Sequence, residues 1–176
     1  YNKPVIQQFD NENYEKLEKL TGSIRDKFKP ENWDDETKNN FYNRPYLQIE
    51  KLASKYLNEL NLGSRPACVL PKILEESLSI KLFYCKAEST GSAASTISDS
   101  FGLAIMINSN DAPWRRNYDI AHEFFHLITW NIFSDEEIYG QENQKSEIEK
   151  WAEAFASSIL LPESEVRMEF NKRLKE

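Results

Sequence analysis

Two histidines and the glutamate beside the first of them are the side chains in this sequence best suited to chemistry. They lie in the pentapeptide His122-Glu123-Phe124-Phe125-His126, an H-E-x-x-H pattern, and the 176-residue chain contains no other histidine. Residues four apart lie on one face of an α-helix, so both imidazoles can reach one metal ion. Glu123 is offset around the helix and suits a general base that acts on a water at the metal. Two histidines placed at random produce this pattern on the order of once in 700 chains of this composition.

A catalytic zinc ion usually takes three protein ligands and one water, so the motif needs a third ligand. The residues after His126 lack the glycine and the third histidine of the longer H-E-x-x-H-x-x-G-x-x-H pattern, and neither Cys68 nor Cys85 lies in a context typical of a thiolate ligand. A carboxylate from a later segment remains, and the candidates are Glu142, Glu147, Glu149 and Glu153.

Glu149 shares a helical face with the small residues Ala152 and Ala156, which would let its helix approach the histidine-bearing helix closely. Glu153 shares that face as well. We therefore favour Glu149 as the third ligand, with Glu153 as the main alternative.

The periodicity of apolar side chains predicts the elements that position these residues. Spacings of three and four predict helices over residues 14–28, 45–62, 67–78, 113–131, 145–160 and from 163 onward, the last of them amphipathic. Alternation predicts strands over residues 80–85 and 101–108. The segment between the strands is rich in small polar residues and is predicted as a turn or loop with room for a short strand near Thr96.

The remaining segments carry fewer signals. Residues 31–43 are predicted as loop, and Asp111 is placed to cap the helix that Pro113 begins. The whole pattern of helices and strands predicts an α+β fold in which additional helices precede the strands.

Composition excludes several classes of function. The chain has 22 Lys and Arg against 29 Asp and Glu, a net charge of −7, which argues against direct binding to nucleic acid. No stretch approaches the roughly 20 apolar residues of a membrane-spanning helix. The amino end lacks the layout of a signal peptide, and two cysteines without C-x-x-C spacing favour a reducing compartment, so we expect a cytoplasmic protein.

The sequence resembles the ImmA/IrrE metallopeptidases in two blocks. The first block is residues 121–126, and the second is residues 149–162, which read E-K-W-A-E-A-F-A-S-S-I-L-L-P. The strand over residues 103–108 and the following Pro113 also resemble that family. The resemblance implies a thermolysin-like zincin core, in which a small, mostly antiparallel sheet packs on helices. It also implies that His122, His126 and Glu149 are zinc ligands and that Glu123 is the base.

The resemblance also implies a zinc-dependent endopeptidase that cleaves a regulatory protein, such as a helix-turn-helix repressor. Residues 44–176 would then form the metallopeptidase domain, and residues 1–43, which resemble nothing familiar, would be an N-terminal extension. Three positions depart from the family: Phe125 replaces a common Gly, Glu153 a common Asn, and Asn117 a common Arg. Phe125 and Glu153 keep open an alternative, a non-catalytic binding module of the same fold that holds a regulatory partner.

Two further expectations concern the substrate. Tyr118, Tyr139 and Arg115 are candidates to stabilise the oxyanion that forms during peptide hydrolysis. The strand over residues 101–108 could present a free edge to which an extended substrate adds as another strand.

Overall fold

The structure, a computed structural model, describes residues 28–86, 91–98, 102–134, 137–138 and 146–174. Within these residues it has an α+β architecture, as the periodicity predicts. The helices with described bounds are α3 (Asp35–Asn43), α4 (Pro45–Glu59), α5 (Pro66–Glu76), α6 (Pro113–Ile128), α8 (Glu147–Leu160) and α9 (Glu163–Arg173). The strands are β1 (Lys81–Cys85), β2 (Ala93–Ser98) and β3 (Gly102–Asn108). None of the helices in the described ranges is long and apolar enough to cross a membrane.

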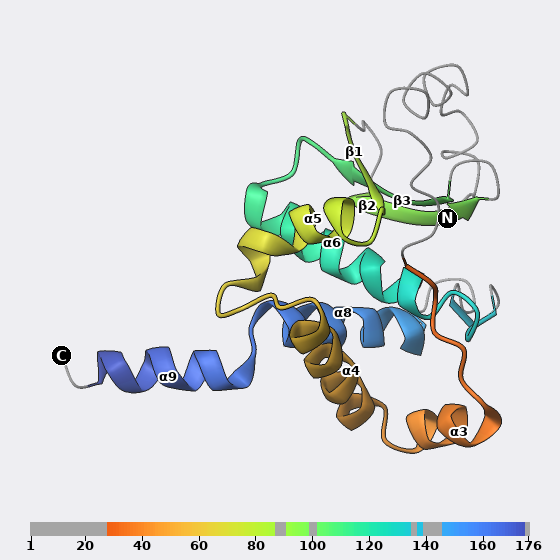
Figure 1. Cartoon of the computed structure of the whole chain (residues 1–176), viewed down its shortest axis with the longest axis horizontal. Coiled ribbons are helices and arrows are strands. Elements are labelled where there is room, and N and C mark those ends of the chain that lie inside the picture. The colour runs from red at the N-terminus through yellow and green to blue at the C-terminus, as the bar shows by residue number, and fades with distance from the viewer. Residues whose placement is uncertain (1–27, 87–90, 99–101, 135–136, 139–145, 175–176) are drawn as a thin grey trace.

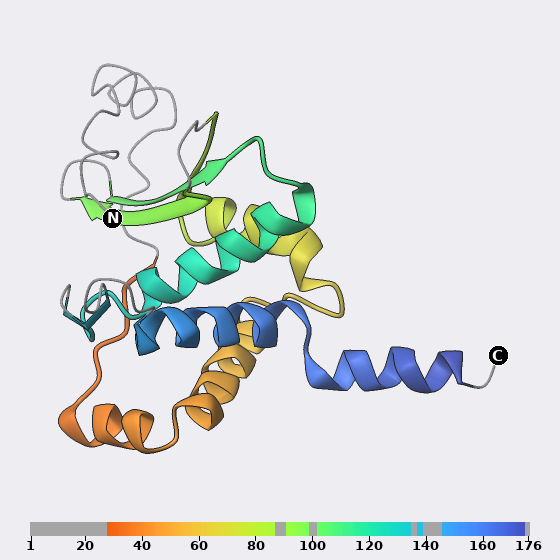
Figure 2. The same ribbon diagram turned by 180° about the vertical axis from the view of Figure 1, so that it is seen from behind.

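The elements stack in layers around α6, the helix that carries both histidines. The sheet contacts one side of α6, α8 packs along another side, and α4 lies beyond α8 (Figures 1 and 2). The buried face of α4 consists of Ile49, Leu52, Ala53 and Tyr56, at the predicted helical spacing. Because α6 is enclosed by a sheet and by a second helix, its side chains near the sheet and α8 have little freedom to move.

The three strands form a mixed sheet in the order β1-β3-β2, not the mostly antiparallel sheet that the sequence predicts. β1 runs parallel to β3, with Lys81 opposite Ala104, and β2 runs antiparallel to it, with Ser95 opposite Ile105. The apolar strand β3 takes the central position and buries Leu103, Ala104, Ile105 and Ile107. A strand that is apolar on both faces gains most from burial, so β3 takes the centre of the sheet and the polar strand β2 lies at its edge.

Residues 31–43 contain helix α3, and the prediction of a loop there was wrong. Asp34 caps the helix by accepting a hydrogen bond from the Thr37 amide at 2.8 Å. Phe41 is the one buried residue of α3 and lies against Trp33, Phe133 and Trp151. A helix anchored by one aromatic ring has no apolar stripe, so periodicity does not reveal it.

Phe28 and Phe41 belong to the same hydrophobic core as the histidine-bearing helix. Phe28 contacts Tyr56 and Phe124 through its ring. Most of the helix predicted over residues 14–28 lies outside the described residues, and the division of the chain at residue 44 stays a prediction.

Two other expectations about helices were wrong. The N-cap of α6 is Ala112, which makes no side-chain hydrogen bond, and Asp111 lies one position too early to cap the helix. Helix α9 buries none of its residues and projects away from the other helices (Figure 1), so its sequence pattern does not correspond to a buried face.

Glu31 joins the segment before α3 to helix α4. Its carboxylate accepts hydrogen bonds from Lys55 Nζ at 2.6 Å and from Tyr56 Oη at 2.8 Å. Burial raises the pKa of this carboxyl, but the bonds from Lys55 and Tyr56 outweigh burial and hold the pKa below its ordinary value of 4.5. The charged form is therefore the one that stabilises the fold.

We expect Glu31→Gln to lower the free energy of unfolding at pH 7, by on the order of 1 kcal/mol or less. Since the folded-state pKa is depressed, the stabilisation is present above the unfolded-state pKa and is lost as pH falls through the folded-state pKa. The difference between the two proteins in urea unfolding should thus be largest at pH 7 and shrink below about pH 4. Glu50→Gln, at an exposed position of α4, controls for the loss of one negative charge. An equal loss in both variants at pH 7 would contradict this role of Glu31.

Candidate metal centre

Helix α6 brings the two histidines of the H-E-x-x-H motif together, as the spacing predicts. Pro113 begins the helix, where its missing amide hydrogen costs nothing. One helical turn separates His122 from His126, and their Nε2 atoms lie 3.2 Å apart. Both rings are largely buried, with side-chain exposures of 16% and 10%.

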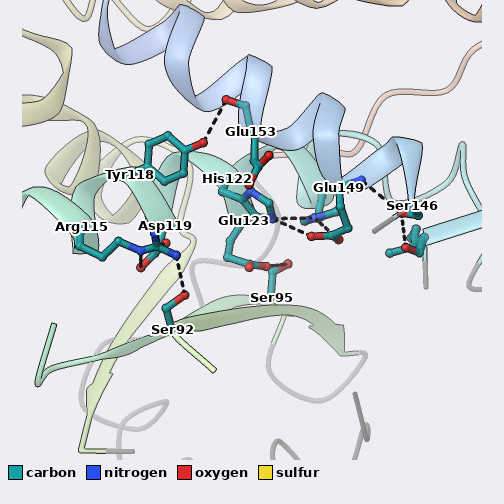
Figure 3. Close-up of polar contacts among 12 residues, drawn as sticks. Ser92, Ser95, Arg115, Tyr118, Asp119, His122, Glu123, Ser146, Glu149 and Glu153 are labelled. Carbon is teal, nitrogen blue, oxygen red and sulfur yellow. Dashed lines mark hydrogen bonds and ion pairs between the residues drawn. The ribbon is translucent and has the colours of Figure 1, made fainter. Parts of the chain in front are cut away.

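Helix α8 supplies Glu149 as the third member of the group. The Glu149 carboxylate lies 3.3 Å from His122 Nε2 through Oε2 and 3.2 Å from His126 Nε2 through Oε1. Ser146 caps α8 by accepting a hydrogen bond from the Glu149 amide at 3.2 Å, which places Glu149 in the first turn of the helix. Figure 3 shows the Glu149 side chain directed at His122.

The small residues of α8 permit this approach. Ala152 and Ala156 are fully buried, and α8 packs along α6. A larger side chain at either position would push the two helices apart, because packed helices approach only as closely as the side chains between them allow. The burial of both alanines and the packing of α8 along α6 are consistent with the sequence-based reason for preferring Glu149, which stays a prediction.

The spacing of the three donors fits a metal ion. One ligand atom from each of His122, His126 and Glu149 lies within 4.8 Å of the others. A tetrahedral zinc ion bonded to nitrogen at 2.0–2.1 Å holds its ligand atoms roughly 3.3–3.4 Å apart. The distances of 3.2 and 3.3 Å in the structure are close to that separation. The group could therefore bind a metal without a large rearrangement of the helices.

Electrostatics within the group favour a positive charge at its centre. Burial lowers the pKa of His126, but the hydrogen bond with Glu149 and the charges of Glu123 and Glu149 outweigh burial, so the pKa is raised. Burial raises the pKa of Glu149, and the hydrogen bonds from both histidines hold the pKa well below its ordinary range. A bound cation would compete with the proton that the imidazoles share with the carboxylate.

Glu123 faces the sheet instead of joining this group. The residue is 9% exposed, and its carboxylate accepts a hydrogen bond of 2.6 Å from the Ser95 hydroxyl through Oε2. Ser95 belongs to the edge strand β2, which runs beneath α6 (Figure 3). Sequence analysis placed a short strand near Thr96 but assigned Ser95 no role, because nothing in a run of small polar residues indicates which of them meets the helix.

Glu153, the main alternative to Glu149, lies one turn further along α8. Figure 3 shows its side chain extending from α8 toward His122, and its backbone carbonyl accepts a hydrogen bond from the Tyr118 hydroxyl at 3.3 Å. Glu153 is not a member of the group that could hold a metal ion. Glu147 forms an exposed ion pair with Lys150 at 2.6 Å, and Glu142 lies outside the described residues.

The candidates for oxyanion stabilisation are engaged elsewhere or not described. Besides the bond of Tyr118 to Glu153, Arg115 pairs with the buried carboxylate of Asp119 at 3.0 Å and donates to the Ser92 hydroxyl at 3.3 Å. Tyr139 lies outside the described residues. The structure thus assigns none of the three to the metal centre.

Phe125, which replaces the glycine common in similar sequences, packs into the core. Its ring is fully buried and contacts Phe133 and Phe155. The ring also lies edge-on to the His126 ring, with centroids 5.9 Å apart, so Phe125 packs in the core beside one of the two histidines.

The prediction that the strand over residues 101–108 offers a free edge was wrong. β3 is central and pairs with β1 on one side and with β2 on the other. Among the described strands, β2 has an outer edge without a partner, and α6 contacts this strand directly.

Residues 75–176 match the family model of the IrrE N-terminal-like domain, Peptidase_M78. The matched range contains both histidines, Glu123 and Glu149. Comparisons with curated proteins and with solved structures found no significant match. The thermolysin-like architecture of the core therefore stays a prediction.

Proposed function

Because the chain belongs to the Peptidase_M78 family, we propose that it is a zinc-dependent endopeptidase with His122, His126 and Glu149 as metal ligands. The observation that carries this proposal is the convergence of two imidazole nitrogens and one carboxylate within 4.8 Å of one another. Nitrogen and carboxylate donors that leave a fourth position for solvent suit zinc better than magnesium or calcium, which prefer oxygen ligands.

Zinc at this position would polarise the substrate carbonyl and lower the pKa of water to about 7. The chain itself supplies the proton transfers. Glu123 takes a proton from the attacking water as its oxygen bonds to the carbonyl carbon, and returns that proton to the leaving amine as the C–N bond breaks. The carboxylate of Glu123 suits this task because it lies beside the metal-binding group without being a member of it.

The edge strand β2 is suited to bind the substrate. Its outer edge carries no described strand partner, and an extended peptide could pair with it through backbone hydrogen bonds. The peptide would then lie alongside α6, next to the two histidines. A regulatory protein such as a DNA-binding repressor is the proposed substrate, and a basic partner of that kind complements the net charge of −7.

Removing the metal tests the proposal. The zinc-loaded protein should cleave unfolded β-casein, and 1,10-phenanthroline should reduce that cleavage to background, because Glu123 alone lacks the polarising charge. Adding zinc in excess of the chelator should restore the rate, which controls for damage by the chelator. Mass spectrometry of the products would map the cleavage sites. Cleavage that persists after complete removal of the metal would overturn the proposal.

The same comparison of metal-loaded and metal-free protein distinguishes the enzyme from the binding module. That alternative predicts a stable complex with an intact partner under all metal conditions. The Phe125 ring is fully buried and contacts Phe155, and the three metal-binding side chains still converge, so this departure from the family does not by itself favour the binding module.

A further inference from the structure

We propose that Ser95 is a positioning residue for the general base, and that its hydroxyl holds the Glu123 carboxylate in the orientation needed for proton transfer. The inference rests on the proposed peptidase function, since it assigns a role to Glu123 in catalysis. It adds a residue from the sheet to a centre that is otherwise built from two helices.

The hydrogen bond between Ser95 and Glu123 is short and runs in one direction. An ionised carboxylate only accepts hydrogen bonds, so the Ser95 hydroxyl is the donor in the 2.6 Å bond to Oε2. Hydrogen bonds to charged groups are shorter and stronger than those between neutral groups. The bond occupies Oε2 of Glu123 and leaves Oε1 for the water and the leaving amine.

The sheet places the Ser95 hydroxyl with little freedom. Ser95 is in register with Ile105 of the central strand, and Ile105 is fully buried. Ser95 therefore sits on a backbone that the ladder to β3 holds in place, whereas the Glu123 side chain has three rotatable bonds. Rigid elements position catalytic groups better than flexible side chains do.

A second polar contact joins the segment just before β2 to α6. Ser92, just before the strand, accepts a hydrogen bond from Arg115 of α6 at 3.3 Å. From Ser92 to Ser95 the strand advances about 10 Å, and from Arg115 to Glu123 the helix advances about 12 Å. The two contacts therefore join β2 and the residue before it to α6 at two points. Of the two, only the contact of Ser95 involves the general base (Figure 3).

β2 is also the strand proposed to bind the substrate. The hydrogen bond between Ser95 and Glu123 therefore links the general base to the segment that pairs with the peptide. Loss of the hydroxyl should leave peptide pairing with the β2 backbone intact, since backbone groups make that pairing. Glu123 should then sample orientations unsuited to proton transfer. The expected consequence is a lower kcat with little change in KM.

Variants that differ by one group test the proposal. Ser95→Thr keeps the hydroxyl, and Ser95→Val replaces that hydroxyl with a methyl group in a side chain of the same shape. Ser92→Ala removes the other hydroxyl that links the strand to α6, without touching Glu123. All variants would be loaded with zinc, and their zinc content measured.

The first readout is the hydrolysis of a fluorogenic peptide made from a β-casein site that the unchanged protein cuts. We expect kcat to fall by about 10- to 100-fold in Ser95→Val, with KM and zinc content unchanged. Ser95→Thr and Ser92→Ala should retain most of the kcat. Equal losses in Ser95→Thr and Ser95→Val, or a full kcat in Ser95→Val, would overturn the role of the hydroxyl.

The second readout does not require activity. Acetohydroxamate gives a proton to a nearby base when it binds zinc, whereas azide has no proton to give. Ser95→Val should bind acetohydroxamate about 10-fold more weakly, with unchanged affinity for azide. Unchanged affinity for both ligands would refute the positioning of Glu123 by Ser95. Failure of the unchanged protein to cleave any peptide would instead count against the proposed function.

Discussion

Replacing Glu123 by Gln is expected to lower the rate of peptide cleavage by about 10²- to 10⁴-fold and to leave the bound metal in place. Glutamine keeps the shape of the side chain and can still accept the hydrogen bond from Ser95. It cannot take up a proton from water, so the attacking oxygen loses its base. Metal binding should persist because the two histidines and Glu149 form the group without Glu123.

The measurement compares initial rates of β-casein cleavage with zinc content from elemental analysis of the same samples. Glu147→Gln is a matched control, since Glu147 is an exposed glutamate at the start of α8 that pairs with Lys150. Its variant should cleave at the rate of the unchanged protein. A Glu123→Gln variant that keeps both its metal and its full rate would exclude Glu123 as the base.

The second large effect concerns the third ligand. Glu149→Gln should weaken zinc binding by more than about 100-fold, because even partners outside the ligand set typically contribute 10- to 100-fold. Gln offers a neutral oxygen in place of a charged one, so the attraction between ligand and ion falls. Glu153→Gln is the matched comparison, since it removes one charge four residues further along α8.

Competition with a fluorescent zinc indicator would measure both affinities at pH 7. We expect the loss of affinity in Glu149→Gln to exceed that in Glu153→Gln by at least about 10-fold. Circular dichroism would show whether each variant keeps its helices. The reverse order, with Glu153→Gln the weaker binder, would assign the ligand to Glu153 and contradict the geometry in Figure 3.

The part of the centre that lies within one helix could be predicted without tertiary structure. His122 and His126 are four residues apart, and the pitch of an α-helix places such residues on one face wherever the helix lies. The preference for Glu149 was a weaker inference, because it required two helices to meet. The inference came from the small residues Ala152 and Ala156, which share a helical face with Glu149, and both are fully buried in the structure.

Other features depend on contacts that periodicity does not encode. β2 lies at the edge because the apolar strand β3 takes the central position of the sheet, and the periodicity of one segment does not indicate which strand will be central. Helix α3 is anchored by Phe41 among aromatic rings from distant segments, so it has no stripe of its own. The apolar residues of α9 are exposed in the described structure, although their spacing predicts a buried face.

The amino-acid sequence was sufficient to predict a pair of imidazoles on one helical face, a carboxylate beside them and an acidic helix downstream. These properties follow from local backbone geometry, which repeats every few residues. The packing of the folded chain was needed to show which acid lies against the histidines and which hydroxyl bonds to Glu123. Those two contacts join residues that are between 23 and 28 positions apart in the chain, counted from His126 to Glu149 and from Ser95 to Glu123. Their distances are set by how α8 and β2 pack against α6.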